Sequence, residues 1–501
     1  METNPAAPAR ATLVATVTSL PEGSFAPVVS DLEDVGWLEI RADLVGDLDA
    51  ARLARLFSGK LLYTLRSRAE GGAFEGSPER RRKRLMEAAA RYDLVDLEVA
   101  RDLTPEVLKA IPAEKRVISW HGPAAGVDGL KTTFERMAAF PAVLYKLVPT
   151  ASQSGDEIAA LLFLESLGRR DVIAFAAGPC GAWTRFVAPR LGAPVVYGML
   201  GEVPGAPGQI SIERLRRDYG LPDLPPVEAL FGLAGNPVTH SLSPRIHNTA
   251  YRALGIPAAY LPFHAESFGD FWLEVVEGGA LETIGLPIRG LSVTAPFKES
   301  ALAVAGAESP LAGLIGAANT LVWNQGVWEA EATDPDGVVL PLRDRGIDLA
   351  SLEAAIVGAG GAGRSAAAGL LKAGARVTLF NRTPDRGRSS ADRLKVPFLP
   401  LSDLDPSRFD LLVNATSLGR GEDDPLPFDV ERVRPGAVVI DLVYLMNRPT
   451  RLLVEAAARG AVAVDGREVL VDQARGQFRM MTGRDLPMDL ARRAAGLEEL
   501  P

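Results

Sequence analysis

The chain of 501 residues is longer than one hydrophobic core usually organises, which predicts two to four domains. Its formal net charge of -9 argues against nucleic acid or an anionic membrane as the main partner. There is no run of about 18 uncharged apolar residues, Glu2 lies where a secretory signal carries positive charge, and the single Cys180 excludes an internal disulfide. We therefore expect a cytoplasmic protein without a membrane span, and the spacing of its four histidines predicts no metal site.

Short apolar runs of the β type recur through the first 200 residues. They cover residues 11–18, 37–43, 60–66, 94–99, 116–122, 142–148, 171–178 and 193–200. Helix-like segments, such as 78–92 and 154–169, lie between them. This alternation predicts an α/β fold of the (β/α)8 TIM-barrel type, whose chemistry lies at the C-terminal ends of the strands.

Polar side chains occupy those predicted strand ends. They are Glu39, Arg41, Arg66, Glu98, His121 and Lys146. Lys146 lies within the apolar stretch "AVLYKLVPT", so it either extends from an edge strand to solvent or is a buried amine kept for chemistry. His121 on its own is more typical of a structural histidine at a strand end.

A proline-rich segment near residue 225 separates a second α/β half. Residues 354–383 are typical of a strand, a glycine turn, a helix and a second strand, with Gly358, Gly360 and Gly363 in a dinucleotide-binding spacing. A plain tight turn is the alternative. Asn381, Arg382 and Thr383 follow the second strand, where NAD-binding folds offer an acid. A guanidinium and a hydroxyl favour the 2′-phosphate of NADP, unless Arg382 is simply solvated.

Three further segments of the second half carry polar groups near predicted strand or helix ends. Ser241 and Ser243 precede a helical stretch, where hydroxyls bind a carboxylate or cap the helix. Lys298 follows a strand and Asp334 precedes a helix. Together beside a nicotinamide they would relay a proton, whereas each alone is typical of a surface salt bridge.

From about residue 231 to the end, the chain resembles shikimate dehydrogenases. The motifs are "SLSPRIHN", "SVTAPFKE", "GAANTLV", "ATDPDG", "VGAGGAGR", "NRT", "NATSLG" and "VDQARGQF". The resemblance implies a catalytic Lys298–Asp334 pair. It implies substrate ligands Ser241, Ser243, Thr294, Asn319 and Gln473, and NADP contacts from Gly358, Gly360, Gly361, Gly363, Asn381, Arg382, Thr383, Asn414 and Thr416. Ser292 and Ala332 stand where the family usually has asparagine.

Residues 11–222 are similar to type I 3-dehydroquinate dehydratases. The motifs are "LEIRAD", "TLRSRAEGG", "VDLEV", "ISWHG", "YKLV" and "APGQ". The resemblance implies that Lys146 forms a Schiff base, that His121 moves protons, and that Arg185 binds the substrate carboxylate. It implies that Glu98, with Glu70 and Asp96, orients His121, and that Glu39, Arg41, Arg66 and Gln209 hold hydroxyls or order loops. Gly205 replaces the family's loop serine, and Ala177 lies near a frequent methionine.

The two resemblances predict a bifunctional enzyme of the shikimate pathway. It would dehydrate 3-dehydroquinate to 3-dehydroshikimate and reduce that ketone to shikimate with NADPH. We predict a dehydratase barrel (1–224), a substrate-binding subdomain (228–333), a Rossmann NADP-binding subdomain (334–475) and a C-terminal helical segment (476–501). One alternative is an oxidative quinate or shikimate dehydrogenase working with NAD, and another is a non-catalytic sensor of pathway intermediates. No pattern determines the oligomeric state.

Overall fold

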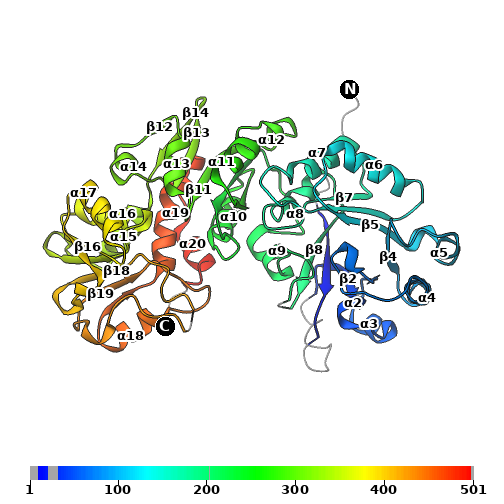
Figure 1. Ribbon diagram of the computed structural model, residues 1–501, viewed down its shortest axis with the longest axis horizontal. Helices are drawn as coiled ribbons and strands as arrows, with labels where there is room; N and C mark the ends of the chain where they lie inside the picture. The colour runs from blue at the N-terminus through cyan, green and yellow to red at the C-terminus, as the bar shows by residue number, and fades with distance from the viewer. Residues whose placement is uncertain (1–9, 21–31, 202, 422, 498–501) are drawn as a thin grey trace. The chain divides into compact units, whose positions relative to one another are not determined.

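The computed structural model describes residues 10–20, 32–201, 203–421 and 423–497 (Figure 1). The chain forms two compact units. Unit 1 comprises Met1–Ala229 and Phe263–Pro287, and unit 2 comprises Leu230–Pro262 and Ile288–Pro501. The two ends of the predicted domain series, 1–9 and 498–501, lie outside the described residues.

Unit 1 contains a parallel sheet with the strand order β7-β6-β5-β4-β3-β2-β1-β8. Its strands are β1 (Thr12–Val17), β2 (Val35–Arg41), β3 (Lys60–Thr64), β4 (Leu94–Glu98), β5 (Arg116–Gly122), β6 (Leu144–Pro149), β7 (Val172–Ala174) and β8 (Val195–Leu200). Each predicted strand is present within a few residues of its expected range. The neighbour order confirms the (β/α)8 barrel, although no ladder joins β7 to β8 among the described residues.

Helices follow the barrel strands and surround them, as the blue-to-cyan part of Figure 1 shows. They are α2 (Ala42–Val45), α3 (Ala50–Leu56), α4 (Pro78–Ala89), α5 (Pro105–Ala110), α6 (Val127–Ala138), α7 (Ile158–Leu167), α8 (Thr184–Val187) and α9 (Ile212–Tyr219). Helix α4 confirms one of the predicted helices. The Ser77 side chain accepts a hydrogen bond from the Arg80 amide at its start, and Leu85 and Ala88 are buried.

Residues 263–287 also belong to unit 1. They contain α11 (Phe268–Phe271), a π-helical turn (Trp272–Val276) and α12 (Ala280–Thr283). The Phe263 ring meets the Trp183 ring edge-on, with 5.2 Å between their centroids. Aromatic packing therefore attaches this segment to the barrel.

Unit 2 begins with a mixed sheet of order β10-β9-β11-β13-β14-β12. Its elements are β9 (Ala229–Gly235), α10 (Ser243–Leu254), β10 (Ala258–His264), β11 (Ile288–Val293), α13 (Lys298–Val304), β12 (Ala307–Glu308), α14 (Pro310–Ile315), β13 (Thr320–Asn324) and β14 (Val327–Glu331). Strand β13 runs antiparallel to β11 and β14. The N-termini of α10 and α13 bring the serines and Lys298 toward one region.

A second sheet is parallel throughout, in the order β17-β16-β15-β18-β19-β20. Its strands are β15 (Glu353–Val357), β16 (Arg376–Asn381), β17 (Phe398–Pro400), β18 (Leu411–Asn414), β19 (Val438–Asp441) and β20 (Val462–Val464). Numbered within the sheet, this is the 3-2-1-4-5-6 order of dinucleotide-binding folds. The predicted Rossmann subdomain is therefore confirmed as a fold.

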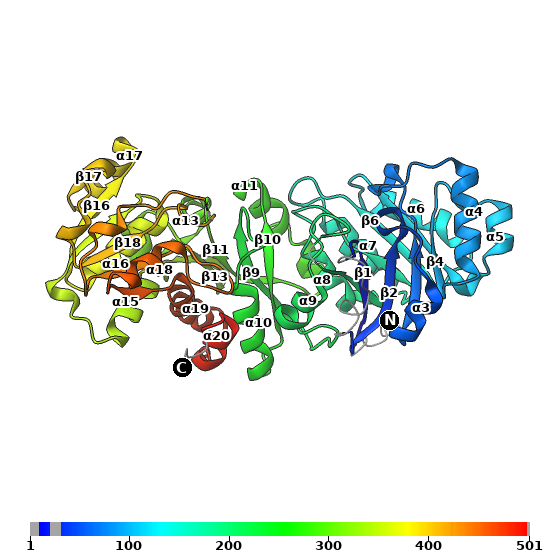
Figure 2. The same cartoon turned by 90° about the horizontal axis from the view of Figure 1, so that it is seen from below.

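The helices of this part of unit 2 are α15 (Asp334–Asp344), α16 (Gly361–Lys372), α17 (Pro384–Leu394), α18 (Arg451–Ala458), α19 (Gly466–Thr482) and α20 (Met488–Ala494). Helices α15 and α19 pack closely, because a Cβ at Gly337 would lie 2.6 Å from the Val469 carbonyl oxygen. Figure 2 shows α19, in red, beside the green β11 and β13. Helix α19 continues through residue 476, where a domain boundary was predicted. None of the helices in the described parts of the chain combines the length and hydropathy needed to span a bilayer.

Candidate active sites

A cavity of about 510 Å³ opens at the C-terminal ends of the unit 1 strands. Most of the predicted side chains of the first half line it, namely Glu39, Arg41, Arg66, His121, Lys146, Arg185 and Gln209. Glu98 does not line this cavity and is fully buried. Strand ends far apart in sequence thus converge on one cavity.

Lys146 lies on β6 between β5 and β7, so it is not on an edge strand. Only 6% of it is exposed, which excludes the interpretation as a side chain extending to solvent. Burial lowers the pKa of Lys146, while Glu39 and Asp96 partly oppose this shift. A larger neutral fraction makes the amine a better nucleophile.

His121 lies on the neighbouring strand β5 and contacts Glu70. The Glu70 carboxylate accepts a hydrogen bond from the His121 amide at 3.0 Å and lies 3.2 Å from Nδ1. Burial, together with Arg66 and Lys146, lowers the pKa of His121 well below its ordinary value. Burial raises the pKa of Glu70 to about 8, against the opposing effect of Arg66. Near neutral pH, Glu70 therefore carries a proton beside the uncharged imidazole of His121. This arrangement suits proton transfer in either direction.

Glu98 has no direct contact with His121 among the described residues. Its carboxylate accepts hydrogen bonds from the Ser67 amide at 2.8 Å and the Ser67 hydroxyl at 2.6 Å. Its charge contributes to the raised pKa of Glu70. The predicted orienting role therefore falls directly to Glu70, and Glu98 acts on His121 only through it.

The predicted substrate ligand Arg66 is already occupied by acidic side chains. Its guanidinium pairs with Asp96 at 3.0 Å, Glu70 at 3.3 Å and Glu98 at 3.4 Å. These charges raise the pKa of Arg66 despite its burial. Arg66 therefore neutralises the acidic cluster below the cavity, which leaves it few donors for a substrate hydroxyl.

Arg41 and Gln209 hold the loop that contains Gly205. Arg41 donates to the Gly205 carbonyl oxygen at 2.6 Å, and Gln209 accepts from the Gly205 amide at 2.9 Å. A Cβ at position 205 would lie 2.9 Å from the Thr18 methyl group and 3.1 Å from Arg41. A serine would have to displace these neighbours, so glycine at this position is compatible with the close packing against Thr18.

Arg185 is a buried guanidinium without an acidic partner in the described residues. Its Nε and Nη2 form no hydrogen bond, and its guanidinium lies 4.8 Å from the centre of the Phe175 ring. Burial lowers the pKa of Arg185 to about 10, so it stays charged at neutral pH. An unpaired buried cation at a cavity wall is suited to bind an anion such as a carboxylate.

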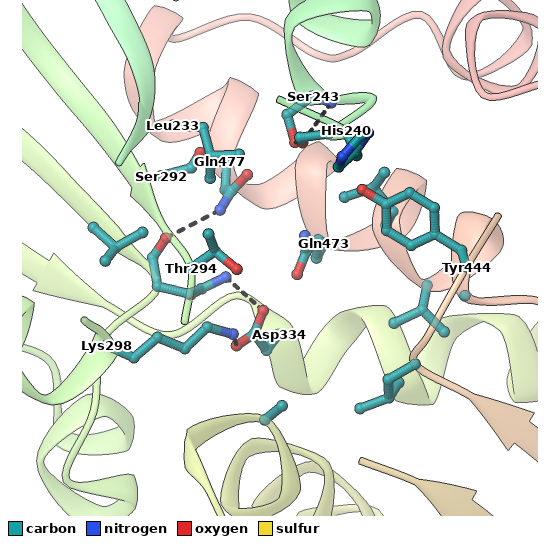
Figure 3. A pocket seen from close by; sticks show the side chains of 18 of the residues that line it. Leu233, His240, Ser243, Ser292, Thr294, Lys298, Asp334, Tyr444, Gln473 and Gln477 are labelled. Carbon is teal, nitrogen blue, oxygen red and sulfur yellow. Dashed lines mark hydrogen bonds and ion pairs between the residues drawn. The ribbon is translucent and has the colours of Figure 1, made fainter. Parts of the chain in front are cut away.

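Unit 2 contains a second cavity of about 470 Å³, shown in Figure 3. The predicted residues lining it are Ser241, Ser243, Thr294, Lys298, Asn319, Asp334 and Gln473. Lys298 and Asp334 point toward each other in Figure 3 and form an ion pair. Asn319 donates to the other Asp334 oxygen at 2.8 Å, and Gln477 donates to the Asn319 carbonyl oxygen at 3.2 Å. The amine and carboxylate are therefore held in place before any ligand binds.

The opposite end of this cavity carries hydroxyl groups. Ser241 and Ser243 are joined by a 3.2 Å hydrogen bond, and Ser241 also accepts from the Ser243 amide at 3.1 Å. Tyr444 lines the same cavity and interacts with Ser241. Sequence reasoning missed Tyr444, although its position just after β19 was a signal. Ser292 accepts from the Tyr260 hydroxyl at 2.6 Å, so its own oxygen is oriented.

The glycine turn between β15 and α16 has the geometry of a dinucleotide site. Gly358 has φ +113°, and a Cβ at Gly363 would lie 1.9 Å from the Gly358 carbonyl oxygen, so both positions require glycine. A Cβ at Gly360 would lie 3.6 Å from the Arg386 guanidinium, and α16 begins at Gly361. A pyrophosphate fits at such a helix N-terminus. Asn381 accepts from the Ala359 amide at 3.2 Å and donates to the Thr383 carbonyl oxygen at 2.8 Å.

The remaining predicted cofactor residues flank this turn. Arg382 and Thr383 are exposed, and Arg382 forms no ion pair within the described residues, so it is available for a phosphate. Asn414 is fully buried and accepts from the amide and hydroxyl of Thr416 at 3.0 and 2.7 Å. Asn414 therefore shapes the loop that lies against Gly358. In the part of the chain that the structure describes, no His, Cys, Asp or Glu side chains cluster as a metal site requires.

Comparisons with known proteins match both halves. The type I 3-dehydroquinase family matches residues 24–223, and the shikimate dehydrogenase substrate binding domain matches residues 233–321. A chloroplastic bifunctional 3-dehydroquinate dehydratase/shikimate dehydrogenase from Arabidopsis thaliana is 30% identical over 90% of this chain and 78% of its own length. An NADP(+) shikimate dehydrogenase from Methanothrix thermoacetophila is 36% identical over 52% of this chain and 94% of its own. A solved dehydroquinate dehydratase and shikimate dehydrogenase structure from S. pombe AroM covers 97% of this chain and 98% of its own at 22% identity and a TM-score of 0.43.

Proposed function

The chain belongs to the family of bifunctional 3-dehydroquinate dehydratases/shikimate dehydrogenases, and from this premise we propose that unit 1 dehydrates 3-dehydroquinate and unit 2 reduces the product to shikimate. The observation that carries the proposal is a pair of lysines in opposite environments. Lys146 is a desolvated amine at one cavity, whereas Lys298 is paired with Asp334 at the other. The first suits imine chemistry and the second suits proton donation.

In unit 1, the Lys146 amine attacks the C3 ketone, and the carbonyl oxygen leaves as water to give a protonated imine. The imine draws electrons from C2, so His121 removes a C2 proton. His121 then returns a proton to the C1 hydroxyl, which leaves as water, and hydrolysis frees Lys146. Arg185 holds the substrate carboxylate, and its unpaired nitrogens support this assignment. Glu70 positions His121.

In unit 2, Lys298 donates a proton to the carbonyl oxygen of 3-dehydroshikimate, and the ion pair with Asp334 keeps the amine oriented. Ser241, Ser243 and Tyr444 bind the carboxylate at the far end of the cavity. Gly358, Gly360 and the start of α16 would hold the pyrophosphate of NADP, with Arg382 on the 2′-phosphate. When bound, the reduced nicotinamide supplies the hydride.

The direct test assays the purified full chain for both reactions. We expect formation of 3-dehydroshikimate from 3-dehydroquinate, and oxidation of NADPH when 3-dehydroshikimate is added. A strong preference for NAD with quinate would instead indicate the oxidative enzyme. Binding of both ligands without turnover would indicate a sensor and refute the proposal.

We also propose the domain division predicted from sequence, with the barrel separated from the dehydrogenase between residues 224 and 228. The two family matches support it, because the first ends at residue 223 and the second begins at 233. Limited proteolysis should cut between these positions, and protection of that segment would contradict the division.

We further propose that the chain works in the cytoplasm. The buried free thiol of Cys180 is compatible with a reducing compartment. Cell fractionation followed by assay of both activities tests this, and recovery of the chain from another compartment would overturn it.

A further inference from the structure

Lys146 has no hydrogen bond or ion pair among the described residues, although it is almost fully buried. The two carboxylates that act on its pKa are occupied elsewhere. Glu39 accepts from the Thr16 and Thr64 hydroxyls at 2.7 and 2.8 Å. Asp96 pairs with Arg66 at 3.0 Å and accepts from Ser119 at 2.7 Å. Carboxylates therefore do not hold the Lys146 nitrogen in place.

The group that Lys146 does contact is the ring of Tyr197. The Lys146 Nζ lies 3.9 Å from the centre of this ring, well within the range of cation–π attraction. Tyr197 is on β8, is 4% exposed and lines the same cavity. In such barrels, each interior layer of side chains comes from alternate strands. Tyr197 on β8 belongs to the same layer as Glu39 on β2, Asp96 on β4 and Lys146 on β6.

We infer that Tyr197 is a positioning residue of the dehydratase site. Its ring face holds the Lys146 nitrogen and stabilises the positive charge that this nitrogen carries in the protonated imine. The inference rests on the proposed dehydratase function and deepens it. The ring is in contact before substrate arrives, so no rearrangement is required when the charge appears. Glu39 and Asp96 attract that charge, but Arg66 and Arg41 repel it, which leaves the ring attraction uncancelled.

The hydroxyl of Tyr197 carries a second part of this role. It forms no hydrogen bond in the described parts of the chain. A buried hydroxyl without a partner costs free energy, and an oxygen of a ligand in the cavity removes that cost. The hydroxyl is therefore assigned to a hydroxyl or carboxylate oxygen of the substrate, whereas the ring is assigned to the lysine.

The ring contact can be tested in the free protein, without substrate. The rate at which acetic anhydride acetylates Lys146 is measured against pH by peptide mass mapping. The charged and titratable groups around the amine, Glu39, Arg41, Arg66, Asp96 and His121, are unchanged in every variant. Tyr197→Leu should lower the pH midpoint of Lys146 acetylation by about one unit, because no ring then stabilises the ammonium form of Lys146. Tyr197→Phe should retain the wild-type midpoint.

Tyr145→Leu is the matched control. Tyr145 is the neighbour of Lys146 on β6, but its ring packs against Phe134 of the helix layer, at 5.6 Å between centroids. Tyr145→Leu should leave the pH midpoint of Lys146 acetylation unchanged. An equal shift in Tyr145→Leu and Tyr197→Leu would mean that loosening of the barrel causes the effect, and an unshifted midpoint in Tyr197→Leu would refute the ring contact.

Steady-state kinetics test the consequence for turnover. Tyr197→Leu should lower kcat of the dehydratase about tenfold, and Tyr197→Phe should raise KM roughly fivefold with kcat retained. An unchanged KM in Tyr197→Phe would refute the role of the hydroxyl. Absence of dehydration in the wild-type protein would refute the proposed function instead, while the labelling experiment would still judge the contact.

Discussion

Each of the two cavities is lined by a lysine, but the two lysines lie in different electrostatic environments. Lys146 is surrounded by a barrel interior whose acids are occupied by other partners, so desolvation dominates and its pKa falls. Lys298 lies at the start of α13 and is paired with Asp334. In the proposed mechanisms the same side chain is a nucleophile in one unit and a proton donor in the other, and we attribute the difference to the surrounding carboxylates.

The contrast extends to how each cavity binds an anion. Unit 1 offers a single buried guanidinium, Arg185, without a partner. Unit 2 offers neutral hydroxyls, among them Ser241, Ser243 and Tyr444. We therefore propose that the carboxylate of 3-dehydroshikimate is bound by charge in the first cavity and by hydrogen bonds in the second.

The largest expected effect comes from removing the first lysine. Lys146→Ala should lower the dehydratase rate by roughly 10⁴-fold or more, because the covalent route is lost. Dehydrogenase activity, measured on the same sample, serves as the control and should stay within about twofold. Retention of dehydratase activity would remove the distinction between the two lysines.

Substitutions in the Lys298–Asp334 pair should impair the dehydrogenase reaction and spare the dehydratase reaction. Lys298→Ala and Asp334→Asn should each reduce the rate of 3-dehydroshikimate reduction by about 10²–10⁴-fold, which is the usual contribution of a positioned acid. Asn319 would remain to orient residue 334 in the asparagine variant, so that variant isolates the charge. Loss of the dehydratase reaction in either variant would contradict the independence of the sites.

Replacement of the anion receptor should affect binding in unit 1 alone. Arg185→Met should raise the dehydratase KM and lower kcat/KM about 100-fold, because the buried carboxylate contact is lost. Arg185→Lys should recover only part of this, since an ammonium has no bidentate fork. An unchanged KM in Arg185→Met would place the substrate carboxylate elsewhere.

The pH dependence should also distinguish the units. His121 must be uncharged to accept the C2 proton, and its pKa lies well below the ordinary 6.5. Dehydratase kcat should therefore be retained as pH falls to 6.5 and be lost only below it, as the imidazole becomes protonated. A profile of kcat against pH checks this, and an acid midpoint above 6.5 would mean that His121 is not the base.

The smallest expected effect concerns the cofactor. Arg382→Ala should raise the KM for NADPH about tenfold and leave the weaker use of NADH unchanged, because an exposed arginine contributes modestly to phosphate binding. Comparison of the two KM values measures the change. An equal change for both nicotinamides would indicate that Arg382 does not contact the 2′-phosphate.

Local patterns were sufficient to predict most of the fold. The barrel strands, the glycine turn and helices such as α4 follow from hydrophobic runs and turn residues that lie close together in sequence. Motifs also identified Lys146, His121, Lys298 and Asp334, which the structure brings into two cavities.

Contacts between distant segments were harder to predict. Glu70 rather than Glu98 reaches His121, because a short turn after β3 lies beside β5. Arg66 was expected to bind substrate, but its guanidinium is paired with buried acids such as Asp96. The resemblance named Glu70 together with Glu98 and did not distinguish them, and no sequence period or spacing shows that the acids pair with Arg66. Tyr444 was missed although it directly follows β19, because its contact with Ser241 forms only when the chain folds.

The most direct test of the contrast between the lysines is borohydride trapping with 3-dehydroquinate, followed by peptide mass mapping of the full chain. Reduction converts an imine into a stable amine, so only a lysine that forms a Schiff base keeps the label. We predict label on the peptide containing Lys146 and none on the peptide containing Lys298. Label on Lys298, or repeated absence of label on Lys146 while dehydratase activity persists, would contradict the account.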